Sequence, residues 1–352
     1  MEIVTTIGPK TINPESLKSL VKAGATDMRI NLSHSSTELL EEYCAVFAKA
    51  GINPSLDTQG AQLRVTEVSD NEFNKGETVI IYFERKPNNK ADHIIKLNHR
   101  ECVPQLSTGD IIRLDFAGLT LRIDEVIEEE YYILARVNSP GKCILNRAVD
   151  IVNKPIKLNH LTEFDKYAIS KMAVIGCPRI YYSFANSEKD VKELRSMLPK
   201  DVKLVSKIET KRGVSNLLGI AKESDAILID RGDLSREFSI ATIPQVSDAV
   251  ISACKKLGVE VYVATNILDT MMTNKLPSRA EISDIWNLLA KGTDGIVLAA
   301  EVAIGDNPVD SVCVVNHMYK LRQVYDNNLI LSYDKSLTFD DDHMSLELKS
   351  WF

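Results

Sequence analysis

The feature that most constrains the fold of this chain is the repeated alternation of short apolar runs with amphipathic segments. Eight apolar runs have the length and composition of buried parallel strands. The expected strands are residues 3–6, 27–31, 53–57, 179–184, 203–208, 226–230, 259–265 and 295–299. Eight strands alternating with helices predict an α/β chain folded as a parallel (β/α)8 TIM barrel. A doubly wound open sheet is the alternative architecture.

Cap residues support the helices expected between these strands. Asn13 followed by Pro14 is a typical helix start, and Gly24, Gly51 and Gly258 stand where helices should end. The expected helices are residues 14–23, 37–50, 163–175, 187–198, 214–222, 243–257, 279–291 and about 309–324. A helix directly follows each strand except the third, where the alternation is interrupted.

The interrupting segment has the period of two that is typical of strands. Such runs occur at 78–82, 111–114, 119–123 and 131–137, and turn residues such as Pro140-Gly141 separate them. We therefore expect a β-rich lid domain at 67–156, inserted after the third strand of a barrel formed by residues 1–66 and 157–325. Residues 326–352 are polar, contain an acidic run at 340–342 and are interpreted as a C-terminal tail.

Charge and cysteine content narrow the classes of function. Lys and Arg total 42 and Asp and Glu total 49, a formal net charge of −7 that disfavours nucleic acid as a partner. No apolar run approaches the roughly 20 residues that a transmembrane helix needs, so we expect no membrane association. The first residues lack a signal-peptide pattern, and the six scattered cysteines are typical of reduced thiols. We therefore expect a cytoplasmic protein.

Polar residues follow the expected strands at their carboxyl ends, where barrel enzymes place their active sites. In chain order they are Arg29, Asn31, Ser33, His34, Asp57, Thr58, Arg64, Lys207, Glu209, Arg231, Gly232, Asp233, Thr265, Asn266 and Glu301. Taken singly, they also fit ordinary strand-end pairs and turns. Their clustering at one mouth of the expected barrel favours a functional site.

The chemistry of this set points to a metal and a phosphoryl group. Glu209 and Asp233 follow neighbouring strands and offer the oxygen ligands that Mg²⁺ or Mn²⁺ prefers. Lys207 lies two residues before Glu209 and therefore on the same face of its strand. Lys and Arg beside a divalent metal suit phosphoryl transfer, because charge builds on the phosphoryl oxygens. The turn at 231–233 can present backbone N–H groups to a carboxylate.

Several short motifs occur in a characteristic order over about residues 1–325. They are Thr6-Ile7-Gly8-Pro9, Arg29-Ile30-Asn31-Leu32-Ser33-His34, Asp57-Thr58-Gln59-Gly60, Leu161-Thr162-Glu163-Phe164-Asp165, Ser183-Phe184, Lys207-Ile208-Glu209, Arg231-Gly232-Asp233-Leu234, Ala264-Thr265-Asn266, Ser278-Arg279-Ala280-Glu281 and Ala299-Ala300-Glu301-Val302-Ala303. Together they resemble the pyruvate kinase family. The resemblance implies phosphoryl transfer from phosphoenolpyruvate to ADP, followed by protonation of the enolate.

The resemblance also implies a role for each matching residue. Lys207 and Arg29 would contact the transferring phosphoryl group, and Thr265 would lie near the face where the enolate is protonated. Glu209 and Asp233 would hold Mg²⁺ or Mn²⁺. The substrate carboxylate would be held by Gly232, Asp233 and Thr265.

The nucleotide side carries departures from the family's motifs. The resemblance implies nucleotide phosphates near His34 and Arg64, but Gln59 stands where the family has Lys. Gln62 stands where the family has the Glu that accompanies K⁺ dependence, which leaves a K⁺ requirement open. Asp230 replaces an Ala and adds negative charge beside the metal. The implied ligands of a monovalent cation are Asn31, Ser33, Asp57 and Thr58.

The carboxyl-terminal part of the sequence also differs from the family. The usual member carries a further regulatory domain of on the order of a hundred residues, whereas fewer than thirty residues follow the last expected helix here. We therefore expect a short, divergent member with one contact surface between subunits. A symmetric contact through one patch closes as a homodimer, and the candidate patch is formed by residues 243–257 and 282–289.

The sequence leaves the reaction partly open. The leading expectation is a pyruvate kinase-like phosphotransferase that acts on phosphoenolpyruvate and a nucleotide. One alternative is a divergent enzyme with a different phosphoryl acceptor. Others are a metal-dependent aldolase or lyase that holds a pyruvate enolate, and a binding protein without catalysis. Lys207 and Arg29 favour phosphoryl transfer over the lyase, because both would contact a phosphoryl group.

Overall fold

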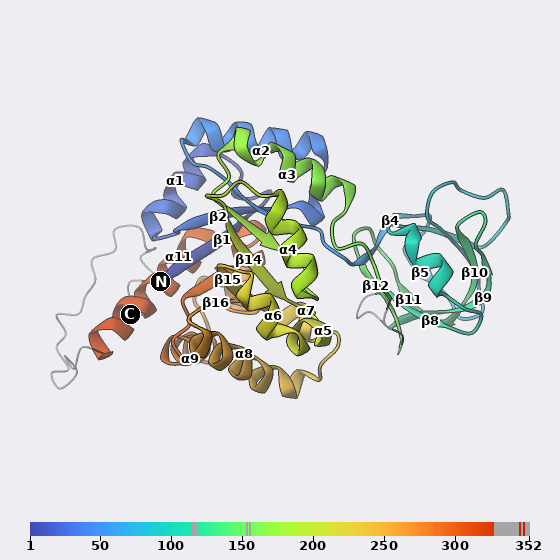
Figure 1. Cartoon of the computed structure of the whole chain (residues 1–352). Coiled ribbons are helices and arrows are strands. Elements are labelled where there is room, and N and C mark those ends of the chain that lie inside the picture. Colours follow the sequence, from blue (N-terminus) through green and yellow to red (C-terminus); the bar gives the residue numbers. More distant parts are fainter. Residues whose placement is uncertain (115–117, 153, 155, 327–344, 346–347, 349–352) are drawn as a thin grey trace. The chain divides into compact units, whose positions relative to one another are not determined.

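Eight parallel strands close into a barrel, which confirms the predicted (β/α)8 TIM-barrel fold (Figure 1). Their order around the barrel is β1-β17-β16-β15-β14-β13-β3-β2, and β1 pairs with β17 to close it, so the open sheet is excluded. The strands are β1 (Glu2–Ile7), β2 (Asp27–Asn31), β3 (Ser55–Asp57), β13 (Arg179–Tyr182), β14 (Lys203–Ile208), β15 (Ala226–Asp230), β16 (Glu260–Ala264) and β17 (Gly295–Leu298).

The computed structural model describes residues 1–114, 118–152, 154, 156–326, 345 and 348. The chain divides into two compact units, the first made of Met1–Gln59 with Glu163–Phe352 and the second of Gly60–Thr162. The acidic run expected at 340–342, like most of the expected tail, lies outside the described residues.

Helices cover the outside of the eight-stranded barrel (Figure 1). The helices of this unit are α1 (Pro14–Ala23), α2 (Thr37–Ala50), α3 (Glu163–Ile175), α4 (Glu188–Met197), α5 (Lys211–Ser215), α6 (Leu217–Lys222), α7 (Arg231–Leu234), α8 (Ile243–Leu257), α9 (Arg279–Ala290), α10 (Ala300–Ala303) and α11 (Pro308–Asp326). Of these, α7 and α10 are four-residue turns that follow the carboxyl ends of β15 and β17. Asn13 caps α1 as expected, since its side chain accepts a hydrogen bond from the N–H of Ser16. Among the described residues, no helix combines the length and apolarity needed to cross a bilayer.

The helix expected at 214–222 is wrong in its bounds. The Thr210 side chain accepts a hydrogen bond from the N–H of Gly213 and starts α5 three residues earlier. Asn216 then interrupts the helix and separates α5 from α6. Its side-chain amide donates to the carbonyl of Asn186, 2.8 Å away, so a tertiary contact holds it in a position that helical periodicity alone does not reveal.

The second unit contains a closed seven-stranded barrel with the order β10-β6-β7-β4-β12-β8-β9. Its strands are β4 (Leu63–Val68), β6 (Thr78–Tyr82), β7 (His93–Leu97), β8 (Ile111–Leu114), β9 (Leu119–Ile127), β10 (Tyr132–Ser139) and β12 (Ala148–Ile151), with β5 (Glu72–Phe73) and β11 (Gly141–Lys142) paired separately. The boundary expected between residues 66 and 67 falls inside β4. Because β4 pairs with β7 and β12, residues 60–66 belong to the second unit.

Strand periodicity decides which side chains point into the eight-stranded barrel. Val205, Leu228 and Tyr262 belong to one buried apolar cluster to which six of the barrel strands contribute. Side chains two residues apart lie on the same face of a strand. Lys207 therefore shares the inward face of Val205, and Asp230 shares that of Leu228. The apolar interior thus ends in charged groups at the carboxyl ends of the strands.

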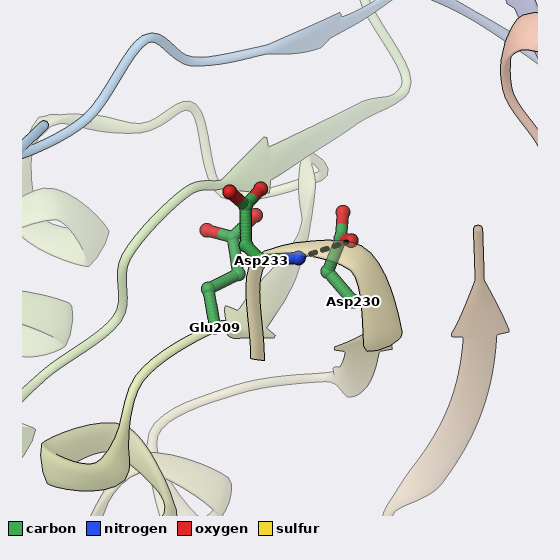
Figure 2. Close-up of side chains that lie close together, drawn as sticks. All are labelled: Glu209, Asp230 and Asp233. Atoms are coloured by element: carbon green, nitrogen blue, oxygen red, sulfur yellow. Dashed lines mark hydrogen bonds between the residues drawn. The ribbon is translucent and has the colours of Figure 1, made fainter. Parts of the chain in front are cut away.

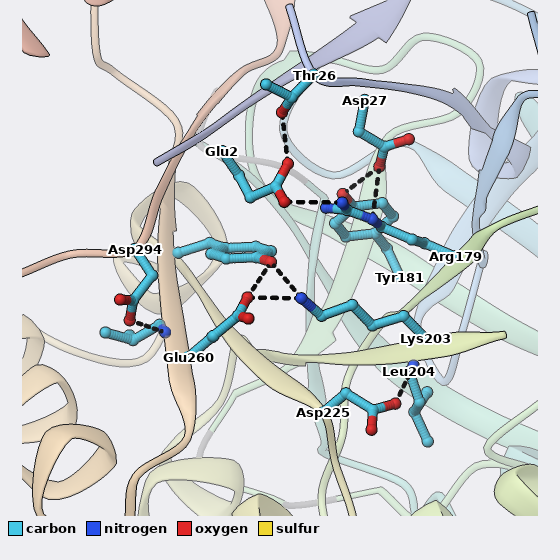
Figure 3. Close-up of polar contacts among 12 residues, drawn as sticks. Glu2, Thr26, Asp27, Arg179, Tyr181, Lys203, Leu204, Asp225, Glu260 and Asp294 are labelled. Atoms are coloured by element: carbon cyan, nitrogen blue, oxygen red, sulfur yellow. Dashed lines mark hydrogen bonds and ion pairs between the residues drawn. The ribbon is translucent and has the colours of Figure 1, made fainter. Parts of the chain in front are cut away.

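A second polar network lies at the amino-terminal ends of the barrel strands (Figure 3). Arg179 donates to Glu2 across 2.8 Å, and its Nε lies 4.0 Å from Asp27 Oδ2. The buried Tyr181 hydroxyl donates to the same Asp27 oxygen across 2.6 Å. These residues tie β1, β2 and β13 together. Residues at the amino-terminal face of a TIM barrel usually contribute to stability, because the active site lies at the opposite, carboxyl-terminal face.

Replacing Tyr181 by Phe should therefore lower the free energy of unfolding. The ring stays, but buried Asp27 loses a hydrogen-bond donor, which costs about 1–3 kcal/mol. Urea unfolding followed by circular dichroism measures the change. Tyr325→Phe is the matched control, because it removes the same hydroxyl from a side chain that is 47% exposed. Equal stability of both variants would show that Tyr181 acts through its ring alone.

Candidate active site at the carboxyl ends of the barrel strands

Lys207, near the end of β14, is a buried cation surrounded by acceptors. Its Nζ lies 3.0 Å from Ser183 Oγ, 3.1 Å from Asp57 Oδ1 and 3.0 Å from Glu209 Oε1. Burial opposes the charged form of the amine, but the surrounding carboxylates outweigh it and raise the pKa of Lys207 above its usual range. Lys207 is therefore a fixed positive charge at neutral pH.

Arg29, on β2, is a second buried cation beside Lys207. Its Nη1 lies 3.0 Å from Asp57 Oδ2, and its Nε donates to Thr6 Oγ1 across 3.0 Å. The guanidinium also stacks over the Tyr181 ring, 5.2 Å from its centroid. Asp57 thus lies between two cations and holds both in place.

Three carboxylates converge at the ends of β14 and β15, as Figure 2 shows. Lys207 Nζ lies 3.0 Å from Glu209 and 3.9 Å from Asp230. Glu209, Asp230 and Asp233 each offer one oxygen, and these oxygens lie within 4.8 Å of one another. Burial and the neighbouring negative charges raise the pKa of Glu209 to about 8, although Lys207 opposes this, and burial with Asp233 also raises the pKa of Asp230.

This cluster fits a divalent metal. Glu209 Oε1 is buried and accepts no hydrogen bond, although it lies near Lys207, while Oε2 accepts from the N–H of Phe184 across 2.5 Å. A carboxylate oxygen that makes an ion pair with Lys207 but accepts no hydrogen bond, with two further carboxylates beside it, is a donor set that suits Mg²⁺ or Mn²⁺. A bound cation would also relieve the electrostatic repulsion among the carboxylates of Glu209, Asp230 and Asp233.

The turn after β15 is held against the loop after β16. Thr265 Oγ1 accepts from the N–H of Gly232 across 2.7 Å, and Arg231 donates to the carbonyl oxygens of Thr265 and Asn266. Thr265 has a φ of 68°, in the left-handed region that β-branched residues rarely adopt. Asp284 also binds Arg231, across 2.7 Å, so the strained Thr265 backbone is fixed from several sides.

The residues expected to bind a monovalent cation lie at or just after the carboxyl ends of β2 and β3, which are adjacent strands. Asn31 and Asp57 face each other as register partners of β2 and β3. Asn31 Oδ1 accepts from the N–H of Ser33 across 2.9 Å, and the Thr58 hydroxyl accepts from the N–H of Ser183 across 2.9 Å. The side-chain oxygens of Asn31, Asp57 and Thr58 are therefore engaged with the protein itself.

The two residues expected near nucleotide phosphates belong to different units. His34 is exposed at the end of a short 3-10 turn, Leu32–His34, after β2. Arg64 lies on β4 in the second unit, where its Nη1 donates to the carbonyl of Asn146 across 3.0 Å. Gln62 is in the second unit too, and Gln59 donates from its amide to the carbonyl of Leu32.

Ser183 was not among the expected site residues, and Glu301 was expected at the mouth without an assigned role. Ser183 Oγ donates to the carbonyl of Thr58 across 2.7 Å and accepts from Lys207, so it joins two parts of the site. Its place directly after β13 was the available signal. Glu301, in contrast, accepts from the backbone N–H groups of Ile267, Leu268 and Ala299, and so braces loops.

Comparison with known proteins places these features in one family. The family model "Pyruvate kinase, barrel domain" matches residues 1–312. The pyruvate kinase of Methanocaldococcus jannaschii is 31% identical over 91% of this chain and 69% of that protein. That of Lachancea kluyveri is 30% identical over 89% of this chain and 65% of that protein. The chain thus spans about two thirds of the length of these relatives.

Solved structures agree with this result. A crystal structure of Cryptosporidium parvum pyruvate kinase superposes with a TM-score of 0.82 at 25% sequence identity, covering 92% of this chain and 70% of that one. A second crystal structure of a pyruvate kinase from the same organism gives a TM-score of 0.76.

Proposed function

The chain belongs to the pyruvate kinase family, and from this premise we propose that it transfers a phosphoryl group from phosphoenolpyruvate to ADP, giving pyruvate and ATP. The observation that carries the proposal is the buried Lys207, 3.0 Å from Glu209 and beside three converging carboxylates. A fixed cation next to a divalent-metal site is what phosphoryl transfer requires.

In this proposal, the site residues act by position and charge. Lys207 and Arg29 stabilise the negative charge that builds on the transferring phosphoryl oxygens. Glu209 and Asp233 hold Mg²⁺ or Mn²⁺, which neutralises substrate charge when it is bound. The N–H groups of Gly232 and Asp233, with the Thr265 hydroxyl, orient the substrate carboxylate. Thr265 also lies on the side from which the enolate is protonated.

A direct assay tests the proposal. Purified protein is incubated with phosphoenolpyruvate, ADP and Mg²⁺, and pyruvate is measured with a coupled dehydrogenase. We expect pyruvate and ATP in equal amounts and no reaction when Mg²⁺ is removed by a chelator. Failure to form pyruvate with any nucleoside diphosphate would overturn ADP as acceptor and with it the strict form of the proposal.

Gln59 favours a second candidate function with a different phosphoryl acceptor. Its amide is bound to the carbonyl of Leu32, 3.0 Å away, and it supplies no positive charge where the family has Lys. An acceptor screen with phosphorus NMR distinguishes the two functions, because it detects any new phosphorylated product. If ADP outcompetes every other acceptor, the second candidate is wrong.

Asp233→Asn should weaken metal binding while leaving the fold intact. Mutation of a residue that only hydrogen-bonds to a metal ligand typically reduces metal affinity by about 10–100-fold. Loss of the charge of a ligand itself should reduce Mn²⁺ affinity by at least as much. Calorimetric titration of Mn²⁺ measures the change. Asp201→Asn, an exposed carboxylate outside the site, is the control. An unchanged titration of Asp233→Asn would remove this residue from the metal site.

A monovalent-cation site at Asn31, Ser33, Asp57 and Thr58 remains part of the proposal. Arg29 and Lys207 already neutralise Asp57, with distances of 3.0 and 3.1 Å. The enzyme therefore requires K⁺ only if the substrates bring negative charge that Arg29 and Lys207, already paired with Asp57, do not neutralise. Assays in potassium and tetramethylammonium salts of equal ionic strength decide it.

We also propose a homodimer, although its candidate patch is smaller than the sequence indicated. Ile243, Val250 and Ile251 on α8 are buried against the rest of their own unit. On α9, Ile285, Leu288 and Leu289 are buried as well. The large apolar side chains left exposed near α8 are Ile240, just before the helix, and Leu257, its last residue. Light scattering should give about twice the chain mass of 39.2 kDa. A mass equal to that of one chain would contradict the dimer.

A further inference from the structure

Asp230, the last residue of β15, places a carboxylate where the proposed substrate carboxylate should bind. It is buried, and its Oδ1 accepts from the N–H of Asp233 across 3.4 Å and from the Thr265 hydroxyl across 3.2 Å. These are two of the three groups proposed to orient the substrate. The third, the N–H of Gly232, is bound to Thr265 Oγ1.

The available donors cannot serve two carboxylates at once. The Thr265 hydroxyl has a single proton, already shared between Asp230 and the carbonyl of Ala264, 2.6 Å away. Asp230 and Thr265 also border the open side of Gly232, because a Cβ added there would lie in ordinary van der Waals contact, 3.4 Å from both Asp230 Oδ1 and Thr265 Oγ1. A substrate carboxylate would therefore have to displace Asp230.

Electrostatic repulsion from Asp230 also opposes the binding of a substrate carboxylate. Asp230 lies among the oxygens of Glu209 and Asp233, and its Oδ2 is 3.9 Å from Lys207, which already contacts Glu209 and Asp57. A carboxylate that enters this buried cluster meets an additional like charge at short range, where the local dielectric screens it poorly. An uncharged residue at position 230 would remove that repulsion.

We propose that Asp230 determines substrate specificity by occupying, with its own carboxylate, the position of the substrate carboxylate. This role rests on the proposed function, since it assumes a phosphoryl donor that carries a carboxylate. The chain then binds phosphoenolpyruvate only when Asp230 rotates away, and it discriminates against carboxylate-bearing donors relative to a site with a short apolar residue there.

A purely structural role for Asp230 predicts the opposite result. If Asp230 served only to cap the turn 231–234, its loss would loosen the donors and weaken phosphoenolpyruvate binding. If it occupies the substrate position, Asp230→Ala frees charge-assisted donors and tightens binding by about 10–100-fold. Asp230→Asn keeps the accepting oxygen and removes only the charge, so an intermediate gain is expected.

Because Asp230 also borders the metal cluster, the Mn²⁺ affinity of wild type, Asp230→Ala and Asp230→Asn is measured first. The test is then calorimetric binding at a Mn²⁺ concentration that saturates each of the three proteins. Phosphoenolpyruvate and inorganic phosphate are the two probes, because phosphate lacks the carboxylate. We expect both variants to bind phosphoenolpyruvate more tightly than wild type, and phosphate affinity to change much less. Thermal melting checks that each variant is folded, and Asp230→Asn carries the test if Asp230→Ala does not fold.

The outcomes separate this role from the proposed function. Equal or weaker phosphoenolpyruvate binding by the folded variants overturns the role of Asp230 while leaving the function in place. An equal gain for phosphate and phosphoenolpyruvate also overturns it, because the effect would then be unspecific charge. If Mn²⁺ binds but phosphoenolpyruvate binds to none of the three proteins, the proposed function is wrong and this role with it.

Discussion

Replacing Lys207 by Met should lower kcat for pyruvate formation by about 10²–10³-fold, the cost of removing one preorganised charge from a transition state. Met is similar in shape to the uncharged stem of Lys and lacks the ammonium group. That group lies within 3.1 Å of Ser183, Asp57 and Glu209, so no other residue can take its place without moving. Steady-state kinetics at saturating Mg²⁺ measure the loss.

Two further variants make this result specific. Lys18→Met removes the same charge from an exposed position on α1 and should leave kcat unchanged. Circular dichroism and thermal melting of Lys207→Met should show a folded barrel, so that the loss reports catalysis. Turnover by Lys207→Met within a few-fold of wild type would overturn the proposed mechanism.

Replacing Asp57 by Ala should give the largest effect on stability. Its two oxygens lie 3.0 Å from Arg29 Nη1 and 3.1 Å from Lys207 Nζ, and all three side chains are buried. Removing one partner of a buried ion pair leaves an uncompensated charge, which costs about 3–5 kcal/mol. Guanidinium unfolding should show a lower midpoint without a change in its denaturant dependence.

A double-mutant cycle checks the cause. Asp57→Ala removes one counterion of Lys207 and leaves Glu209, 3.0 Å away. If that loss contributes to the destabilisation, adding Lys207→Met should recover part of the lost free energy of unfolding. Asp57→Asn, which keeps the shape and a hydrogen-bond acceptor, should cost less than Asp57→Ala. Strictly additive effects of the two substitutions would mean that Asp57 stabilises the barrel through Arg29 alone.

The sequence predicted the barrel well because strand and helix periods are local signals. Three expected strands, at 27–31, 203–208 and 226–230, have the bounds of β2, β14 and β15. The errors lie where tertiary contacts override periodicity. Asn216 interrupts a helix because it binds Asn186, and β4 joins the second unit because it pairs with β7 and β12.

Part of the candidate site could also be predicted, because the position of a residue relative to the end of its strand can be identified in the sequence. In a parallel barrel all strands run in one direction, so residues after their carboxyl ends gather at one mouth. Lys207, Glu209 and Asp57 follow this rule and lie together. Ser183 follows it as well, but a lone serine gives no chemical signal until its contacts with Thr58 and Lys207 are known.

By itself, the sequence determined the barrel, the inserted second unit and the residue types at the mouth, because these depend on order and period along the chain. Only the tertiary structure decided which of these residues touch. In the folded chain, Glu301 accepts hydrogen bonds from backbone N–H groups, and Asp57 lies between the cations of Arg29 and Lys207. Asp230 accepts hydrogen bonds from the Thr265 hydroxyl and the N–H of Asp233. The physical reason is that a hydrogen bond forms only within a narrow range of donor–acceptor distances. Atoms from strands far apart in the sequence reach such distances only after the barrel has closed.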